Sequence, residues 1–302
     1  MPNAKLKHYL HLHFLVFIAG FTAILGELIT IGALELVWFR MSIAGVLMFL
    51  YIKFRKLKLR ISKKTLLQFS IAGVIIALHW ITFFESINQA NVSIALAMFS
   101  SGAFFASFIE PLFFKRRILA FEILFGIIVI LGVYLITMSE MTHIKGIILG
   151  LISALFSTLF AVINGRFIER YDSTLISFYE FISGVLFLTV FIIFTGTKFN
   201  LEFFSLSTSD WVYLFILASI CTAYAFIGAV EIMRYISPYT VILSYNLEPV
   251  YGITLALFLF PENEKMSPQF YIGAILILAT ILLDAILKNR KRRKGKTRTI
   301  AS

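Results

Sequence analysis

Two stretches of this chain, ESINQANVSIALAMFSSGA (Glu85–Ala103) and EIMRYISPYTVILSYNLEP (Glu231–Pro249), align with each other without a gap. Each follows an apolar run, opens with a glutamate, forms a short polar turn and enters another apolar run. The constant offset of 146 residues is close to half of the 302-residue chain. A duplication at that period indicates two copies of one helical unit. In a membrane protein, such a repeat is typical of secondary transporters, whose substrate site lies where the repeats meet.

The composition predicts an all-α polytopic membrane protein. The chain is 60% hydrophobic, has a mean hydropathy of +0.92 and contains 33 Phe, whereas soluble domains are about half apolar and a quarter charged. Each backbone amide in lipid must be satisfied within its own segment, so the long apolar runs are expected to be helices. Those runs lack the alternation of period two that marks the strands of a membrane β-barrel.

The apolar runs predict ten transmembrane helices. They cover residues 12–31, 34–52, 66–87, 93–113, 120–138, 144–165, 174–195, 211–230, 238–260 and 269–287. Only a short polar break separates the first two, so a re-entrant pair is the alternative there. Because five is odd, the second set of five enters from the opposite face, which makes the repeats inverted. The expected units are 1–138 and 139–287, followed by a basic cytoplasmic tail at 288–302.

The positive charges predict the orientation. With the N-terminus inside, the inner segments hold 23 of the 27 Lys and Arg residues, and the outer loops hold only Lys145, Lys198 and Lys265. This bias places both termini in the cytoplasm and the protein in the cytoplasmic membrane. The net charge of +11 is then membrane-surface charge, and nucleic acid is not an expected partner. The expected partners are a small-molecule solute and the lipid bilayer, and assembly as a homodimer is left open.

The sequence resembles the EamA-type transporters of the drug/metabolite transporter superfamily. A half of such a protein carries an arginine in its second helix, a turn of the form A-L-x-x-x-x-A-x-x-A, and a Pro-containing helix that ends in an acidic residue. Arg40 in VWFRMSIAG, the two aligned turn stretches, and Pro249 with Glu262 in FPEN match these features. The first half departs from them, because Ala103 and Arg116 stand where the proline and the acidic residue are expected.

This resemblance implies a transport fold and leaves the substrate undefined. Members mostly move amino acids, metabolites or drug-like compounds, often outward. A second internal match, FRMSIAGVLMFL (39–50) with FYEFISGVLFLT (178–189), supports the duplication through the pair Gly45 and Gly184.

Glu248 is the clearest candidate for substrate or proton binding. An ionisable group within a span costs about 2.5–3.5 kcal/mol on insertion scales, so it usually faces a cavity or a partner. Glu248 lies at the middle of the ninth predicted span, precedes Pro249, and follows Tyr245 and Asn246. We predict that these polar residues take part in binding. The alternative is that the Glu248 side chain only joins neighbouring helices through hydrogen bonds.

His79 and Trp80 lie in the middle of the third predicted span. A histidine there can titrate near neutral pH, and a tryptophan offers a flat surface to an aromatic or cationic solute. The alternative is a neutral histidine bonded to a neighbouring helix. The equivalent positions of the eighth span are alanine and phenylalanine beside Tyr224, which predicts an asymmetric, partly aromatic cavity. Asn164 and Glu180 are further candidates of the same kind.

Four charged residues are candidates for gates or salt bridges. Glu27 and Arg40 lie toward the outer ends of adjacent spans, where an ion pair between them would be structural or would close an outer gate. Glu85 and Glu231 occupy equivalent positions at opposite membrane faces. They are candidates for the two gates, and the alternative is that each caps a helix turn at the interface.

No enzyme signature stands out: the sequence has no Walker-type phosphate loop, no metal-ligand cluster and no GxSxG motif. We therefore expect no cofactor, no metal and no enzymatic activity. The expected function is secondary transport by alternating access, with export favoured and protons as the driving ion. An uncoupled facilitator, a membrane-embedded transferase and a non-transporting sensor are the alternatives.

Overall fold

The computed structural model describes residues 5–115, 117–118, 120–168, 170–232, 235–236, 244–245 and 247–300. These residues are helical throughout, without strands. The first half contains α1 (Leu6–Leu28), α2 (Ala33–Phe54), α3 (Lys63–Gln89), α4 (Val92–Phe99), α5 (Gly102–Phe114) and α6 (Ala120–Ser139). The second contains a 3₁₀ turn (η1, Met141–His143), α7 (Ile144–Phe167), α8 (Ser173–Phe194), α9 (Leu201–Phe204), α10 (Thr208–Ala218), a π-helical turn (η2, Ser219–Tyr224), α11 (Ala225–Ile232), α13 (Glu248–Leu259) and α14 (Pro268–Ile300).

Eight helical stretches in the described residues are long and apolar enough to cross a membrane. They correspond to the first eight predicted spans, so the prediction of an all-helical membrane fold is confirmed. In the region of the last two spans the structure has shorter apolar helices, Glu248–Leu259 and Pro268–Thr280. Part of the predicted ninth span, at 238–243 and 246, lies outside the described residues.

Polar residues in the connections fix where several helices begin. The side chains of Ser62, Asn91, Asp172 and Ser207 each accept a hydrogen bond from a backbone N–H in the first turn of the helix that follows. Such N-caps satisfy amides that have no partner within the helix. Asn91 belongs to the first of the two aligned stretches, so the polar turn seen in the sequence ends in the cap of α4.

Two of the spans are interrupted. Ser100 and Ser101 separate α4 from α5, and the Ser100 hydroxyl donates to the carbonyl of Leu96. The eighth span contains the π-helical turn η2, in which the Thr222 hydroxyl donates to the carbonyl of Leu217. Irregular backbone at membrane depth is tolerated where protein or a cavity surrounds it, and π-bulges are frequent at functional sites.

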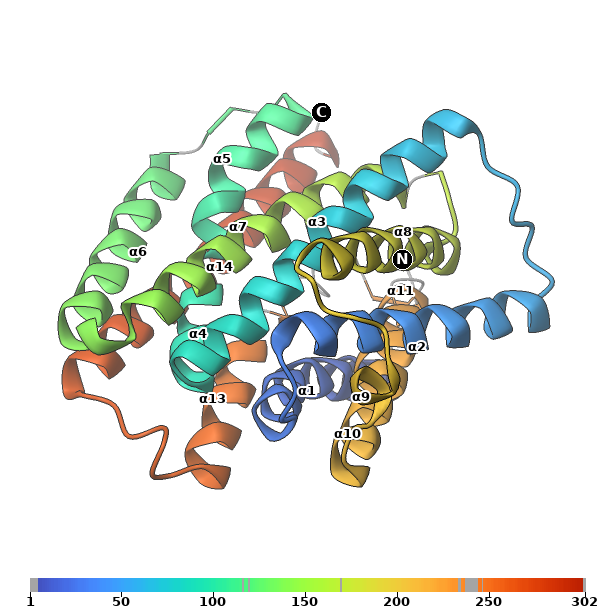
Figure 1. The fold of residues 1–302 in the computed structure, drawn as a ribbon. Helices are drawn as coiled ribbons and strands as arrows, with labels where there is room; N and C mark the ends of the chain where they lie inside the picture. The colour runs from blue at the N-terminus through green and yellow to red at the C-terminus, as the bar shows by residue number, and fades with distance from the viewer. Residues whose placement is uncertain are drawn as a thin grey trace.

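The two halves pack as related units. Helix α3 packs against α7 and α8, and the α10–α11 stretch packs correspondingly against α1 and α2. The pairs α2–α8, α6–α14 and α4–α13 each join equivalent positions of the two repeats. Figure 1 shows α6 and α14 at one side of the molecule, α2 and α8 toward the other, and α3 and α7 crossing between them.

The closest of these crossings requires glycine. A Cβ atom at Gly73 of α3 would lie 2.2 Å from the Glu180 carbonyl oxygen of α8, and one at Gly184 would lie 3.0 Å from the Gly73 carbonyl oxygen. Small residues allow such close contact between membrane helices. The predicted pair Gly45 and Gly184 lies at this same interface, since Gly45 faces Phe181 and Ile182 of α8.

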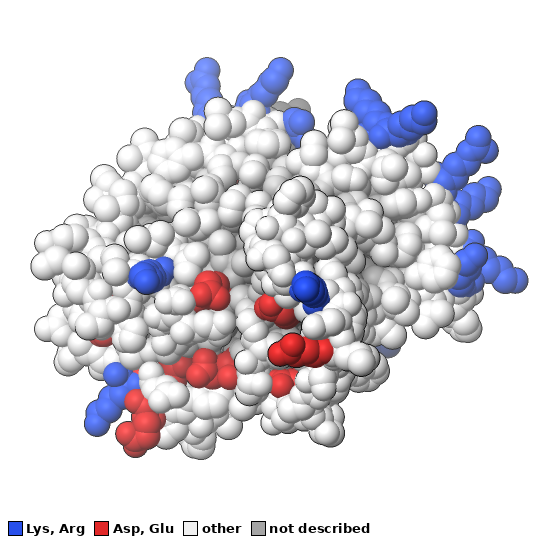
Figure 2. Space-filling model, in the orientation of Figure 1, with Lys and Arg blue, Asp and Glu red and all other residues white. Residues whose placement is uncertain are grey.

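The charged side chains are distributed unevenly over the surface. Figure 2 shows Lys and Arg concentrated along the upper and right edges, Asp and Glu toward the lower part, and a wide uncharged area between them. This distribution is compatible with a bilayer around the middle of the molecule. The cytoplasmic assignment of the termini stays a prediction.

Candidate functional site

A cavity of about 340 Å³ lies between the two repeats. Its size is within the range of about 300–1,000 Å³ that is usual for ligand pockets. Both halves contribute to its wall, which is formed by Ala19, Thr22, Arg40, Ile76, His79, Trp80, Phe83, Phe99, Ser157, Phe160, Asn164, Ile168, Ser173, Ile176, Ser177, Glu180, Cys221, Ala225, Phe226, Ala229, Tyr245 and Glu248. Of the predicted binding candidates, His79, Trp80, Asn164, Glu180, Tyr245 and Glu248 lie in this wall, and so does Arg40.

Equivalent residues of the two repeats face each other across the cavity. Trp80 and Phe226 are 146 positions apart in the sequence, both line the cavity, and their ring centroids are 6.4 Å apart in an edge-on arrangement. Phe99 and Tyr245, separated by the same offset, also line it. Residues that are 146 positions apart in the two repeats therefore line the same cavity. Its wall is partly aromatic and asymmetric, as predicted.

Arg40 is buried in this wall and connects the repeats. Its Nε donates a 2.8 Å hydrogen bond to the hydroxyl of Thr222 in η2. Its guanidinium carbon lies 4.0 Å from the centre of the Trp80 ring, which is the geometry of a cation–π contact. Glu248 lines the same cavity. No ion pair between Arg40 and Glu27 is found among the described residues, so the predicted partner of this arginine is corrected to Thr222 and Trp80.

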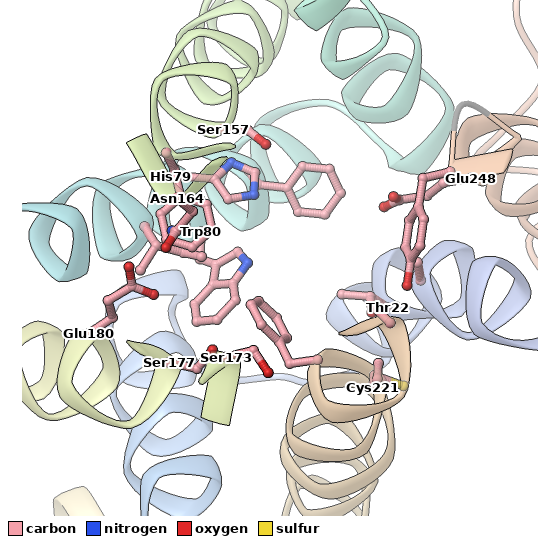
Figure 3. A pocket seen from close by; sticks show the side chains of 18 of the residues that line it. Thr22, His79, Trp80, Ser157, Asn164, Ser173, Ser177, Glu180, Cys221 and Glu248 are labelled. Atoms are coloured by element: carbon pink, nitrogen blue, oxygen red, sulfur yellow. The ribbon is translucent and has the colours of Figure 1, made fainter. Parts of the chain in front are cut away.

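Glu248 lies at the first residue of α13, and its partly buried side chain faces the cavity. Pro249 follows at the start of the helix, where its missing N–H costs no hydrogen bond. Tyr245 is beside it in the wall, and Asn246 lies outside the described residues. Figure 3 shows Glu248 on one side of the cavity and His79, Trp80, Asn164 and Glu180 on the other.

His79 is bonded to a neighbouring helix, as one alternative predicted, and it also lines the cavity. Its Nδ1 lies 3.1 Å from the carbonyl oxygen and 2.9 Å from the hydroxyl of Ser153 on α7, so the ring is bonded to a neighbouring helix. The same ring lines the cavity and stacks on Phe99 at a centroid distance of 5.4 Å. A proton on Nδ1 would be donated to the Ser153 carbonyl, which leaves Nε2 as the acceptor nitrogen.

Glu180 and Asn164 leave polar atoms without hydrogen bonds. Glu180 is 1% exposed, and neither of its carboxylate oxygens has a hydrogen-bond partner among the described residues. The same holds for the Nδ2 atom of Asn164 and for Nη1 of Arg40. Buried polar groups are nearly always paired, with protein, water or ligand. Three residues with unpaired atoms therefore line one cavity.

The other predicted residues lie away from the cavity. Tyr224 is 42% exposed, and its hydroxyl is 2.8 Å from Nε2 of His11. Glu85 accepts hydrogen bonds from Gln89 and Asn88 within its own helix. Glu27 and Glu231 are likewise absent from the wall. The sequence analysis put Tyr224 at the cavity because it assumed a regular α-helix through this span. The π-helical turn η2, which ends at Tyr224, changes the rotation of the helix, and nothing in the sequence indicates that turn.

The sequence analysis missed the polar contacts that join helices at the end of the molecule opposite the α7–α8 turn. Asp210 accepts 2.8 Å hydrogen bonds from both the N–H and the hydroxyl of Thr30, which joins the α1–α2 turn to the start of α10. Glu264 is fully buried and accepts 2.9 Å bonds from the N–H groups of Val92 and Ser93 at the start of α4. Both acids fall in predicted loops, where a carboxylate gives no signal. In contrast, the cavity wall extends in the other direction to Ile168 and Ser173, at the α7–α8 turn.

The described residues contain no group of three or more His, Cys, Asp and Glu side chains that could hold a metal ion. The arrangement instead combines aromatic rings with two carboxylates and one guanidinium, which suits the non-covalent binding of a small amphipathic solute.

Comparison with known proteins gives a family match and two similar proteins. A family model described as the EamA-like transporter family matches residues 7–138 and again 144–284. A protein of Bacillus subtilis (strain 168) named "Uncharacterized transporter YxxF" is 23% identical over 248 residues, which cover 80% of this chain and 75% of that protein. A crystal structure with 13% sequence identity aligns with a TM-score of 0.64 over 93% of this chain and 98% of the other, which is a similarity of fold.

Proposed function

Because this chain belongs to the EamA-like transporter family, we propose that it is a secondary transporter that works by alternating access. Its cargo would be a small metabolite, amino acid or drug-like solute, moved across the cytoplasmic membrane, with export as the favoured direction. The cavity between the repeats is the proposed transport site. Transporters built from two repeats bind their substrate near the middle of the membrane, in a cavity where the repeats meet.

The observation that carries this proposal is the difference between the two ends of the molecule. At one end Thr30 donates two hydrogen bonds to Asp210 and joins the α1–α2 turn to α10, whereas at the other the cavity wall reaches the α7–α8 turn. The distribution of positive charges predicts that this turn is cytoplasmic. The conformation would then be the inward-facing one, and the outward-facing one would require these hydrogen bonds to open.

Proton coupling is the proposed driving mechanism, with Glu248 as the group that exchanges the proton. A carboxylate in a low-dielectric cavity favours its neutral form when the site is empty. Arg40 lines the same cavity, and a positive charge near a carboxylate favours its ionised form. A solute that changes the distance between these two side chains would therefore change how readily Glu248 holds a proton.

The test compares metabolite profiles of cells with and without the protein, and then follows the solute that changes in liposomes containing the purified protein. Accumulation against a concentration gradient under an imposed pH gradient would support proton-coupled transport. Equilibration to equal concentrations without proton flux would make the protein a uniporter. A covalently altered product without movement of any solute would replace the proposal with a membrane-embedded transferase.

A further inference from the structure

The formal charges of the cavity do not balance when Glu180 is ionised. Arg40 and Glu248 bring one positive and one negative group to the wall, so their formal charges balance. Glu180 has no basic counterpart, because no described basic side chain forms an ion pair with it. Its carboxylate oxygens lie near the Asn164 side chain but make no hydrogen bond of normal geometry. A buried carboxylate without a partner costs several kcal/mol unless it is neutralised. An ionised Glu180 therefore needs a positive charge beside it, which either a bound cation or a proton can supply.

The position of Glu180 is fixed by the fold. Its backbone lies at the closest crossing of α3 and α8, where only a glycine fits opposite the Glu180 carbonyl. The crossing therefore fixes where the backbone of Glu180 lies. Figure 3 shows its carboxylate beside the Asn164 side chain, on the wall that also carries Trp80. The carboxylate is therefore available to a ligand in the cavity.

The surroundings of Glu180 suit an ammonium group. An ammonium has three N–H donors, and three acceptors can be supplied here. These are the Glu180 carboxylate, the hydroxyl of Ser177 one turn earlier on α8, and the amide oxygen of Asn164 after rotation of its side chain, since the two ends of an amide are interchangeable in position. Next to these groups the wall is aromatic, formed by Trp80, Phe83, Phe99, Phe160 and Phe226. Aromatic faces attract organic cations.

We propose that Glu180, Ser177 and Asn164 form a subsite for the ammonium group of a monovalent organic cation, whose apolar or aromatic body packs on the rings of the cavity. This inference rests on the proposed transport function and names the class of solute for the same cavity. Glu248, on the opposite side of the cavity in Figure 3, would not take the ammonium.

The experiment measures binding of three probes with one phenyl body and different charges to the purified full-length protein in detergent, by calorimetry. The probes are phenethylamine, a cation, phenylalanine, a zwitterion, and phenylacetate, an anion. Phenethylamine is expected to bind most tightly. Glu180→Gln should weaken its binding about tenfold or more, because a charge-assisted hydrogen bond is lost. The matched control is Glu202→Gln, which removes one carboxylate from exposed α9 and should leave phenethylamine binding unchanged.

The thermal midpoint of the unliganded variant separates binding from folding. Glu180→Gln keeps the shape of the side chain and removes an unpaired buried charge, so the midpoint should stay equal or rise. A marked fall would show that Glu180 has a structural partner and would overturn the proposal. Equal phenethylamine binding by the variant and the original protein would also overturn it.

The remaining outcomes distinguish this inference from the proposed function. Tighter binding of phenylalanine or phenylacetate would overturn the cationic class and leave transport through the cavity intact. Failure of all three probes would overturn the subsite, and the transport proposal would still stand or fall on the metabolite that moves in liposomes. Loss of proton flux in Glu180→Gln without any binding of phenethylamine would show that Glu180 carries a proton instead.

Discussion

The side chain of Arg40 connects the two repeats in the wall of the cavity. It projects from α2 of the first half, lies over Trp80 of α3 and donates to Thr222 in the π-helical turn of the second half. The planar guanidinium suits both contacts at once, since it stacks on the Trp80 ring while its Nε–H donates in a fixed direction. An ammonium can also donate or lie over a ring, but it lacks this planar geometry. The residues of the site therefore act as a connected set and not as isolated charges.

The contact between Arg40 and Thr222 can be measured as an interaction energy. Arg40→Lys and Thr222→Val should each lower the thermal midpoint of the purified protein, by about 0.5–2 kcal/mol of stability for the cation–π contact and the hydrogen bond. The double variant should be no less stable than Arg40→Lys alone, because both changes remove the same bond. If the loss of stability in the double variant equals the sum of the two single losses, the two side chains contribute to stability independently of each other.

Glu248 gives the residue-scale prediction for transport. Glu248→Gln keeps the size of the side chain and removes its charge, so transport in liposomes should be abolished or strongly slowed while the protein still inserts and elutes as a folded species. Glu202→Gln, which removes an exposed charge far from the cavity, is the control. A Glu248→Gln protein with the original transport kinetics would reduce this carboxylate to a structural role.

At the scale of elements, the helix crossings decide how the cavity is shaped. The α3–α8 crossing has backbone against backbone at Gly73, whereas at Gly45 on the neighbouring α2 the nearest atoms are 3.6 Å and 3.9 Å from an added Cβ. The α3–α8 crossing at Gly73 has no room for an added methyl group, whereas there is room for one at Gly45. Because Glu180 belongs to the crowded crossing, the packing of α3 against α8 also determines where the proposed ammonium subsite lies.

Gly73→Ala and Gly45→Ala form a matched pair that tests this view. An alanine at 73 must push α3 from α8, which should cost about 1–3 kcal/mol in stability, as overpacking does. The alanine at 45 meets only side-chain atoms at ordinary contact distance. It should be neutral, or stabilising by up to about 1 kcal/mol through helix propensity. The thermal midpoints of the two variants in detergent provide the measurement, and equal midpoints would contradict the crowding at Gly73.

At the scale of the whole molecule, the duplication and the charge pattern together predict how the chain is oriented in a bilayer. Equivalent helices pair with one another, as α6 does with α14, and the basic side chains lie toward one part of the surface (Figure 2). Two copies of five helices can only follow each other in one chain if the second is inverted. Orientation and repeat structure therefore depend on the same topology.

Cysteine labelling in intact cells tests this topology, in a protein whose native Cys221 has been replaced by alanine. Cysteines at Lys145, Lys198 and Lys265 should react with an impermeant reagent, because the positive charges place these loops outside. A cysteine at Lys58 should react only after the cells are opened. Labelling of position 58 in intact cells would contradict both the orientation and the inverted repeat.

The sequence by itself determined the fold class and the repeat. Long apolar runs leave helices as the only solution in lipid, and the 146-residue offset identified the positions, such as Trp80 and Phe226, that face each other in the cavity. Tertiary structure alone decided which polar residues meet. Arg40 pairs with Thr222 and not with Glu27, Tyr224 turns away toward His11, and Asp210 reaches Thr30 across 180 positions of sequence. The physical reason is that hydrophobicity is a property of each segment, whereas a hydrogen bond between helices depends on their rotation and crossing, which arise only when all the helices pack together.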